Sequence, residues 1–429
     1  MKKYLKKILE RILFIFARAV LKKYEPKVVG ITGSIGKSSA KEAIFAVLNN
    51  KFRARQNIKN YNNEIGLPLT IIGEQSGGRS IKKWLRIFWS AIKLIVKTDQ
   101  KYPEVLILEM GVDHPGDMEY LTALAPVDIG IITNIGPVHL EYFKTIEKVA
   151  REKATLVIKL KPGGWGVLNA DNETVLNLKN SVRGRFLTFG FSQEAIVSAL
   201  EIDLSYKRER VSGISFKLRY QGAIVPVFLP NILADHLVYA ALAAGCVAII
   251  LEMNLVEIAE ALQKFSPPLG RMHLLDGIND SQIIDDSYNA SPEAVIAAVE
   301  TLDKIKCSGR KIAVLGDMME LGDYERTGHE LVGQAIAELG INQLVIVGER
   351  AKIIASSAIA DGFNGDGIKY FDESIGAGDY LLHQVKPGDL LLIKGSQGMR
   401  MERTTKILLA DPSRAESLLV RQEGEWLNK

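Results

Sequence analysis

A glycine-rich segment close to the start of this chain has residue types that could bind phosphate. The segment "VVGITGSIGKSSAKEAI" places Gly33 and Gly36 shortly before Lys37 and Ser38. In loops of this kind, backbone N–H groups and the start of the following helix hold phosphate oxygens. The lysine contacts the terminal phosphates, and the serine hydroxyl is a ligand of Mg²⁺.

The segment departs from the usual spelling of this motif, so its context decides the interpretation. The usual first glycine falls five residues before Gly36, where this chain has Ile31. However, "PKVVGITG" is typical of a short buried strand and "KSSAKEAIFAVLNNK" of a helix that follows it. Because a phosphate-binding loop joins a strand to a helix, we interpret the segment as such a loop. The alternative is a turn whose glycines only ease backbone strain.

Two further side chains follow short apolar runs, where the carboxyl ends of parallel strands are expected. Glu109 ends the run in "LILEMG", and His139 follows another run in "TNIGPVHLEYF". Open α/β sheets bind their ligands at the carboxyl ends of the strands. The two side chains could therefore bind a divalent metal that bridges the phosphates. Taken alone, His139 would instead be interpreted as a structural histidine.

Short apolar runs recur along the chain, and helical stretches lie between several of them. The runs at 104–111 and 127–136 are examples. This alternation predicts an α/β fold with a mostly parallel sheet around the glycine loop. Residues 183–228 alternate differently and predict a small antiparallel patch. The boundary candidate "SPPLGR" (266–271) is followed by further strand–helix alternation, which predicts a C-terminal, Rossmann-like doubly wound domain.

The composition bounds the class of protein. With 429 residues, 47% of them hydrophobic, the chain should hold two or three domains with packed cores. Cys246 and Cys307 are too few for a disulfide framework and lack metal-ligand spacing, so a reducing cytoplasm fits best. The formal net charge is only +4 and the basic residues are concentrated locally. We therefore expect no nucleic acid partner.

Two segments carry most of the basic character. Residues 1–23 have a net charge of +7 and residues 79–97 a net charge of +6. Apolar residues recur in both at helical spacing. They are Leu5, Leu9, Ile12, Phe16 and Val20 in the first segment, and Ile81, Leu85, Phe88, Ile92 and Ile95 in the second. Neither segment is apolar over the length that a bilayer-spanning helix needs, and the first does not resemble a signal peptide.

Two interpretations of these segments remain open. Both could be helices that lie on the inner surface of an anionic membrane, with Trp84 and Trp89 at the headgroup level. Alternatively, both helices pack on each other or on the domain that contains the glycine loop, since an amphipathic stripe more often faces a protein core than a membrane.

A series of sequence blocks, in order, resembles the Mur ligase family. The blocks are "GITGSIGKSS", "YNNEIGLPLT", "LEMGVDHPGD", "TNIGPVHLEYF", "LNADN", "GR" (270–271), "DDSYNASP", "LGDMMELG" and "KGSQGMRME". They run from about Lys27 to Glu402. The glycine loop of that family is written T-G-[ST]-x-G-K-[ST], which Thr32 to Ser38 match. "DDSYNASP" and "LGDMMELG" are similar to the branch that adds D-alanyl-D-alanine to a UDP-N-acetylmuramoyl-tripeptide.

The resemblance implies a domain organisation and a reaction. Residues 27–268 would form the central ATP-binding domain with an insertion at 79–97, residues 269–429 the C-terminal domain, and residues 1–26 a basic helical segment. The implied activity is that of an ADP-forming acid–amino-acid ligase of peptidoglycan synthesis, which uses ATP and Mg²⁺. Its partners would be a muropeptide acceptor and D-alanyl-D-alanine. The acceptor carboxylate would form an acyl phosphate, from which an amine displaces phosphate.

The resemblance also assigns the site residues. Those implied in catalysis are Lys37, Lys153, His139 and Glu64. Those implied in nucleotide binding are Thr32, Gly33, Ser34, Gly36, Lys37, Ser38, Ser39, Arg271, Asp286 and Asn289. Those implied as metal ligands are Ser38, Glu109, His139 and Lys153. Asn62, Asn63 and Glu64 would approach the substrate.

Lys153 has two interpretations. In "EKVAREKATL" it aligns with a lysine that carries a carbamate in these ligases, and a carbamate would supply oxygens suited to Mg²⁺. Taken alone, it would be interpreted as a solvated helix lysine.

The chain departs from the family's pattern at three places. Ala240 stands where the family usually has an asparagine near the adenine, and Thr155 replaces a common glutamate. The family normally has an N-terminal domain of about 80 residues for the uridine nucleotide. Only 26 residues precede the first expected strand here. We therefore expect that domain to be lacking, which leaves a different or lipid-linked acceptor open.

Two other classes of protein are also considered. A folylpolyglutamate-synthase-like ligase would share the glycine loop and metal residues, but "DDSYNASP" and "LGDMMELG" disfavour it. An ATP-binding switch protein without ligase chemistry would not need Glu109, His139, Lys153, Arg271 and Asp286 together.

Overall fold

The computed structural model describes residues 2–58, 61–136, 140–424 and 426. The chain divides into two compact units, each of which is described by itself. Unit 1 comprises residues 1–202, 216–228 and 235–265, and unit 2 comprises residues 203–215, 229–234 and 266–429.

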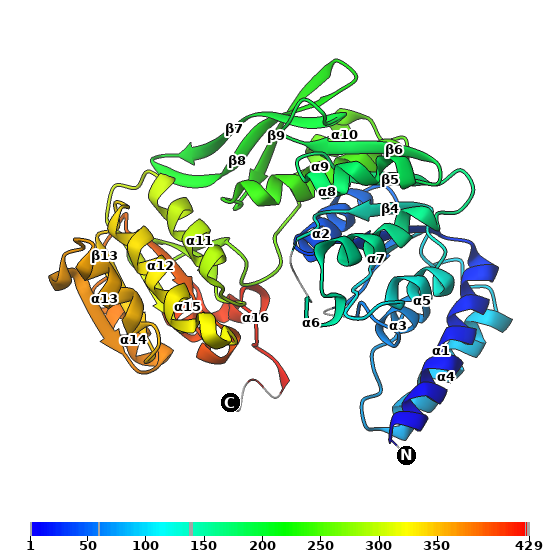
Figure 1. Ribbon diagram of the computed structural model, residues 1–429, viewed down its shortest axis with the longest axis horizontal. Coiled ribbons are helices and arrows are strands. Elements are labelled where there is room, and N and C mark those ends of the chain that lie inside the picture. The colour runs from blue at the N-terminus through cyan, green and yellow to red at the C-terminus, as the bar shows by residue number, and fades with distance from the viewer. Residues whose placement is uncertain (1, 59–60, 137–139, 425, 427–429) are drawn as a thin grey trace. The chain divides into compact units, whose positions relative to one another are not determined.

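A nine-stranded sheet forms the centre of unit 1, and its last strands contribute segments to both units (Figure 1). Its order is β2 (Ala54–Gln56), β3 (Val105–Glu109), β1 (Lys27–Thr32), β4 (Ile129–Ile132), β5 (Trp165–Asn169), β6 (Arg185–Gly190), β7 (Val197–Lys207), β8 (Arg210–Tyr220) and β9 (Ala223–Pro230). The strands from β2 to β7 pair in parallel. Turns of two residues join β7, β8 and β9, so these strands form an antiparallel patch. The predicted range of residues 183–228 begins too early, because β6 pairs in parallel with β5 and β7.

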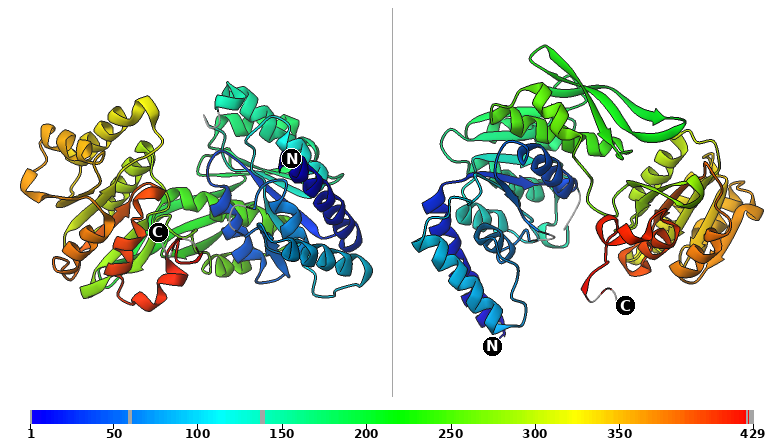
Figure 2. Two further views of the ribbon diagram at one scale, coloured as in Figure 1. Left: turned by 90° about the horizontal axis from the view of Figure 1, so that it is seen from below. Right: turned by 180° about the vertical axis from the view of Figure 1, so that it is seen from behind.

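Helices cover both faces of this sheet (Figure 2). On one face α2 (Lys37–Leu48) packs with α9 (Asp235–Ile250) and α10 (Leu255–Leu262). On the other, α5 (Asp117–Leu124) packs with α7 (Ile146–Ile158). Two helices of four residues, α6 (Leu140–Phe143) and α8 (Glu173–Leu176), also belong to unit 1. The buried strands carry near-continuous apolar runs because both faces are covered.

The two basic segments form helices that lie side by side (Figures 1 and 2). They are α1 (Lys2–Tyr24) and α4 (Ile81–Val96), and both pack against α3 (Gly66–Ile72). Leu13 of α1 and Ile87 of α4 are buried in one apolar cluster. One face of each helix therefore belongs to the core of unit 1.

Unit 2 contains a six-stranded sheet in the order β10 (His273–Asp276), β11 (Gln282–Asp286), β15 (Leu390–Lys394), β12 (Lys311–Gly316), β13 (Gln343–Val347) and β14 (Ile368–Phe371). Only the first pair is antiparallel. Its helices are α11 (Pro292–Lys304), α12 (Glu325–Ala337), α13 (Lys352–Ala360), α14 (Ser374–Leu382), α15 (Glu402–Leu408) and α16 (Ala415–Leu418). The predicted fold class, two α/β units with mostly parallel sheets, is confirmed.

Within the described ranges, no helix is both long and apolar enough to cross a membrane.

The packing of α1 leads to a stability prediction. Leu13 is fully buried, whereas Ile15 on the same helix is 58% exposed. Leu13→Ala should lower the free energy of unfolding of unit 1 by about 2–5 kcal/mol, because it leaves a cavity in the core. Ile15→Ala should change it by less than about 0.5 kcal/mol. Urea denaturation followed by circular dichroism measures both. Equal effects would show that α1 is not packed as described.

Candidate active site

The glycine loop joins β1 to α2 and is fastened to the end of the neighbouring strand β4. The Thr133 hydroxyl donates to the Ile35 carbonyl at 2.6 Å, and Ser34 N donates to Asn134 O at 2.7 Å. Gly136 N donates to Ser34 Oγ at 2.9 Å. These bonds fasten the loop to residues that follow β4.

Two positions of the loop require glycine. A Cβ at Gly33 would lie 2.1 Å from Thr133 Oγ1, and Gly36, which precedes the first turn of α2, has a φ of 81°. The first free N–H groups of α2 therefore lie directly beside the loop, an arrangement that binds anions. Ser39 is buried in this first turn. Thr32 Oγ1 is buried and has no hydrogen-bond partner among the described residues, so it is available to a ligand.

Two lysine amines donate to one carbonyl oxygen of this loop. Lys37 Nζ donates to Gly33 O at 2.7 Å and to Ser34 O at 3.3 Å. Lys153 Nζ, from α7, donates to the same Gly33 oxygen at 3.1 Å, and the residue is only 2% exposed. The interpretation of Lys153 as a solvated helix lysine is therefore wrong.

The surroundings of Lys153 change its titration. Its pKa falls from the ordinary value to about 7, chiefly because burial disfavours the charged amine and also because Lys37 is positively charged. Asp113 and Glu152 act in the opposite direction. Near neutral pH a substantial fraction of this amine is therefore uncharged and nucleophilic.

Glu109 is buried at the carboxyl end of β3, and three polar side chains lie close to its carboxylate. Ser38 Oγ donates to Glu109 Oε2 at 3.0 Å, and Asn62 Nδ2 donates to Glu109 Oε1 at 3.3 Å. Lys41 Nζ lies 4.0 Å from Oε2. In the sheet register Glu109 is opposite Ile31, directly before the loop. The pairing of β1 with β3 thus sets the carboxylate beside Ser38.

The buried side chain of Asn57 fixes the backbone at Glu109. Glu109 N donates to Asn57 Oδ1 at 2.8 Å, and Asn57 Nδ2 donates to Glu109 O at 3.0 Å and to Tyr61 O at 2.8 Å. Lys41 Nζ donates to Asn57 O at 3.1 Å. No motif marks this asparagine, because its role arises only when β2 pairs with β3.

Ser38 and Glu109 offer the hydroxyl and carboxylate oxygens that Mg²⁺ prefers, so the donor set fits this ion. His139, which was predicted as a further ligand, lies outside the described residues. In the part of the chain that is described, no group of three or more His, Cys, Asp or Glu side chains could hold a metal ion. Bound Mg²⁺ would therefore need further oxygens, and the nucleotide phosphates can supply them.

Two residues predicted near the substrate have structural partners. Asn63 Oδ1 accepts from Gly66 N at 3.0 Å near the start of α3. Glu64 is half-buried. It lies near Tyr120, whose pKa is raised to about 12, chiefly because Tyr120 is itself partly buried and also because Glu10 and Glu64 are negatively charged.

Arg271, Asp286 and Asn289 lie together in unit 2, at the carboxyl ends of β11 and β15. Asp286 forms an ion pair with Lys394, whose Nζ also donates to Asn289 O at 3.1 Å. The Arg271 guanidinium lies 4.4 Å from the centre of the Tyr288 ring. Lys394 begins the "KGSQGMRME" block, but the motif alone gives this lysine no individual role.

Arg421 binds the loop that follows β11 and contains Ser287, Tyr288 and Asn289. Arg421 Nη1 donates to Ser287 O at 3.1 Å, and its Nη2 donates to Tyr288 O at 2.7 Å. The guanidinium also pairs with Glu402, which is fully buried and is paired with Arg400 as well. Arg421, which follows α16, thus supports the loop that carries Asn289.

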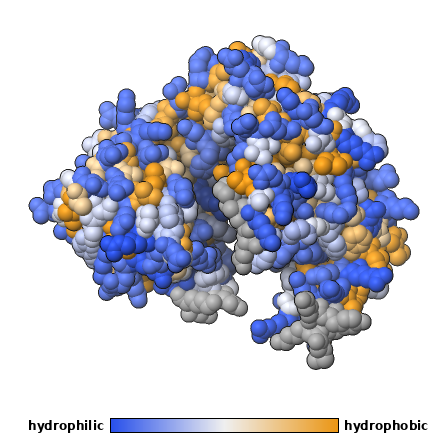
Figure 3. Space-filling view, in the orientation of Figure 1, coloured by the Kyte–Doolittle hydropathy of each residue, from blue (hydrophilic) through white to orange (hydrophobic). Residues whose placement is uncertain are grey.

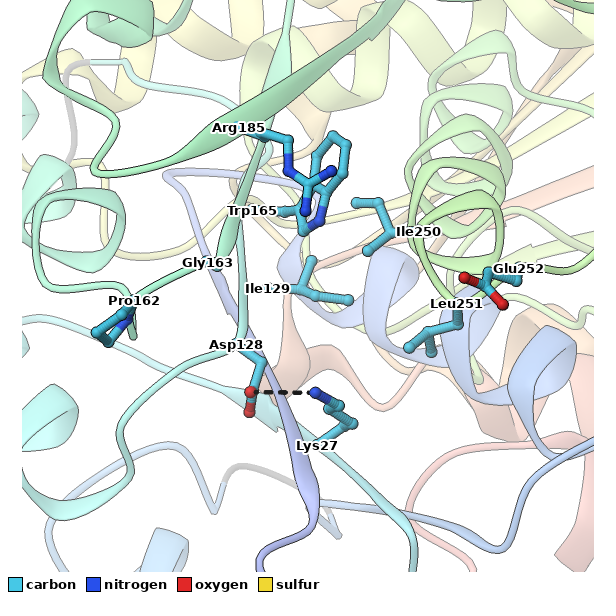
Figure 4. A pocket seen from close by; sticks show the side chains of 11 residues that line it. Lys27, Asp128, Ile129, Pro162, Gly163, Trp165, Arg185, Ile250, Leu251 and Glu252 are labelled. Carbon is cyan, nitrogen blue, oxygen red and sulfur yellow. Dashed lines mark ion pairs between the residues drawn. The ribbon is translucent and has the colours of Figure 1, made fainter.

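A cavity of about 430 Å³ lies elsewhere in unit 1, at the amino ends of the strands (Figure 4). Lys27 and Asp128 form an ion pair of 3.8 Å at its wall, and the Arg185 guanidinium lies 4.6 Å from the Trp165 ring. Ligands of open α/β sheets bind at the opposite, carboxyl ends of the strands. The glycine loop, rather than this cavity, is therefore the candidate active site.

Fold and loop together define a phosphate-binding α/β protein, and comparisons with known proteins identify the family. A model described as "Mur ligase middle domain" matches residues 90–248, and "Mur ligase, glutamate ligase domain" matches residues 270–397. The chain belongs to the Mur ligase family.

Relatives cover most of the chain. The UDP-N-acetylmuramoyl-tripeptide–D-alanyl-D-alanine ligases of Bacillus subtilis and Mycobacterium tuberculosis are both 29% identical to it, over 92% and 90% of this chain and 79% and 73% of the relatives. The structure of the MurF ligase from Thermotoga maritima in complex with ADP has a TM-score of 0.71 and 26% identity, covering 95% of this chain and 84% of that one.

The lowered pKa of Lys153 predicts a pH dependence of stability. The unfolded chain keeps this proton to higher pH than the folded chain does. The free-energy cost of burying the protonated amine is therefore fully present below pH ~7 and decreases as the pH rises toward ~10. Relative to Lys153→Met, the free energy of unfolding of the wild type should increase by up to about 1.4 kcal/mol per pH unit in that window. Urea denaturation in CO₂-free buffer measures it; parallel pH profiles would contradict the burial of a free amine.

Proposed function

We propose that this chain is an ATP-dependent, ADP-forming ligase of peptidoglycan synthesis that adds D-alanyl-D-alanine to a muramoyl-tripeptide. The contact of Ser38 with Glu109 beside the glycine loop is the observation that carries the proposal. It joins a hydroxyl and a carboxylate at the carboxyl ends of two paired strands, which suits a nucleotide bound with Mg²⁺. The named activity of the relatives supports the amide-forming reaction.

In the proposed mechanism the loop residues hold the reacting phosphate. Gly33, Ser34 and Gly36 would shape the cradle, Thr32 and Ser39 would add hydroxyl contacts, and Lys37 would turn from the Gly33 carbonyl toward the terminal phosphate. Mg²⁺ held by Ser38 and Glu109 would offset the charge repulsion between the acceptor carboxylate and the phosphate. The acceptor carboxylate would attack the terminal phosphate, which forms an acyl phosphate and releases ADP. The amine of D-alanyl-D-alanine would then attack the acyl carbon, release phosphate and lose a proton as the amide forms.

The assignment of Arg271, Asp286 and Asn289 to nucleotide binding is also part of the proposal. All three lie around one strand edge of unit 2, within residues 269–429, which we propose as the C-terminal domain. Residues 27–268 would be the ATP-binding domain. Glu64 and His139 are proposed as catalytic residues on the resemblance alone.

We further propose a peripheral contact with an anionic membrane through residues 1–23 and 79–97, at its cytoplasmic face. Both segments are helical and rich in exposed basic residues. A chain at this surface would meet lipid-linked muropeptides, so such an acceptor is the second candidate.

The nucleotide assignment predicts the effect of Lys37→Ala. The variant should lose ligation by several powers of ten, because Lys37 would contact charge that develops on the phosphate. An ADP-release assay with D-alanyl-D-alanine and a panel of muropeptide acceptors measures this, with circular dichroism to verify the fold. A folded variant with near-native turnover would refute the assignment.

We also predict that Lys153 carries a carbamate. Its amine is buried, has a pKa of about 7 and lies 3.1 Å from Gly33 O, so reaction of the neutral amine with CO₂ is favoured there. Lys153→Ala should lose most activity and regain part of it when short carboxylates are added. Mass spectrometry and ¹³C NMR of bicarbonate-equilibrated enzyme test the modification. An active enzyme with a free amine at this position would exclude it.

A further inference from the structure

We propose that α1 and α4 form one docking face for an anionic lipid bilayer, in which an apolar band enters the interface between two rows of cations. The inference rests on the membrane contact proposed above and gives it a defined surface. It does not rest on the ligase activity.

The helix α4 has two apolar faces, of which only one is packed. Ile87 and Ala91 are buried against unit 1, and Phe88 and Ile95 are half-buried beside them. A second row of apolar side chains is exposed. Its members are Ile81, Leu85, Trp89, Ile92 and Val96, which are 39–80% exposed. Their spacing of four, four, three and four residues places them on one face of the helix.

The first helix repeats this arrangement. Leu13 and Ala17 of α1 are buried, whereas Ile8 and Ile15 are 41% and 58% exposed. Ile12 is half-buried between them. The three isoleucines are spaced by four and three residues and therefore form one row on the helix.

The two exposed rows lie on the same side of the seam between the helices. Phe16 lies 5.9 Å from Phe88, and Tyr24 OH donates to Leu94 O at 3.0 Å, so α1 and α4 run parallel. We view each helix along its axis from the N-terminus. The exposed row of α4 then lies clockwise of Phe88, and the exposed row of α1 lies anticlockwise of Phe16. For two parallel helices in contact, these opposite rotations lead to the same side.

A row of cations borders the band on each outer side. The rows are Lys7, Arg11, Arg18 and Lys22 on α1, and Lys82, Arg86 and Lys93 on α4, with Lys97 directly after the end of α4. All eight residues are exposed, and both rows have spacings of four, seven and four. Arg86 alone among them has a described ion pair, with Glu74 at 3.5 Å. In the space-filling view, apolar and hydrophilic residues lie next to each other at the end of unit 1 where Figure 1 labels α1 and α4 (Figure 3).

This pattern fits a bilayer surface better than a second copy of the chain. An apolar strip between two cationic rows matches an interface whose acyl region lies below anionic headgroups. In a twofold contact between two such faces, the cationic rows would approach each other and repel. Since no described helix is apolar enough to cross a membrane, the pair would lie on the surface.

Flotation of the full chain with vesicles tests this face. The wild type should float with phosphatidylcholine–phosphatidylglycerol vesicles at low salt and remain in the soluble fraction with phosphatidylcholine alone. Leu85→Ser combined with Trp89→Ser should lower the partition coefficient about tenfold or more, because both side chains would leave the acyl region. The matched control, Ile224→Ser with Val256→Ser, replaces two exposed apolar residues elsewhere in unit 1 and should bind as the wild type does.

The cationic row has its own pair of variants. Lys82→Glu, Lys93→Glu and Lys97→Glu together should abolish flotation. Lys148→Glu, Lys179→Glu and Arg183→Glu make the same charge change at exposed positions away from α1 and α4 and should retain it.

Fluorescence reports the depth of insertion. Trp89 should shift its emission to the blue on binding, and Trp89→Phe should lose this shift but still float.

Three results would overturn the proposal. They are a wild type that stays soluble with anionic vesicles, equal losses in the test and control variants, and a dimer in sedimentation that Leu85→Ser with Trp89→Ser dissociates. ADP release with a soluble acceptor should be unchanged in the variants of α4. If the wild-type chain floats with anionic vesicles but shows no ligase activity, the result contradicts the proposed function and leaves the docking face untouched.

Discussion

The carbonyl oxygen of Gly33 is the point on which the loop geometry depends. It accepts from Lys37 and from Lys153, which come from helices on different sides of the loop. When both amines are charged they repel each other, which contributes to the lowered pKa of Lys153, and the shared acceptor offsets part of that repulsion. The residue itself has no room for a side chain, because Thr133 Oγ1 occupies the place of a Cβ. Loop shape, lysine placement and lysine titration are therefore set together.

The rest of the phosphate-binding region follows from sheet register. Parallel pairing of β1 with β3 and β4 places the glycine loop, Glu109 and Thr133 at one edge, although they come from distant parts of the chain. No contact within the loop alone would bring Ser38 to Glu109. Asn57 then fixes the direction of the Glu109 backbone, so the carboxylate is oriented by a network rather than by its own rotamer preference.

The sequence predicted the parts of the site that local chemistry marks. Glycine spacing marks the loop, and a carboxylate after an apolar run marks Glu109. Asn57 could not be found in this way, since its partners are backbone atoms of another strand.

The exposed face of α4 was only partly predicted. Helical spacing grouped Ile81, Leu85, Phe88, Ile92 and Ile95 into a single stripe. In the structure, Phe88 and Ile95 pack inward and the other three are exposed, because a stripe this wide meets the core on one side only. Spacing cannot tell which half of a wide stripe packs, and tertiary contacts decide it.

The support of the loop at Ser287 and Tyr288 by Arg421 has a consequence for folding. The guanidinium that holds these two carbonyls, and that pairs with buried Glu402, lies 134 residues further along the chain than Ser287. Until the segment of Arg421 docks, Glu402 has only one of its two arginine partners. The loop is therefore completed by a long-range contact, and such contacts form late because closing a long stretch of chain first costs conformational entropy.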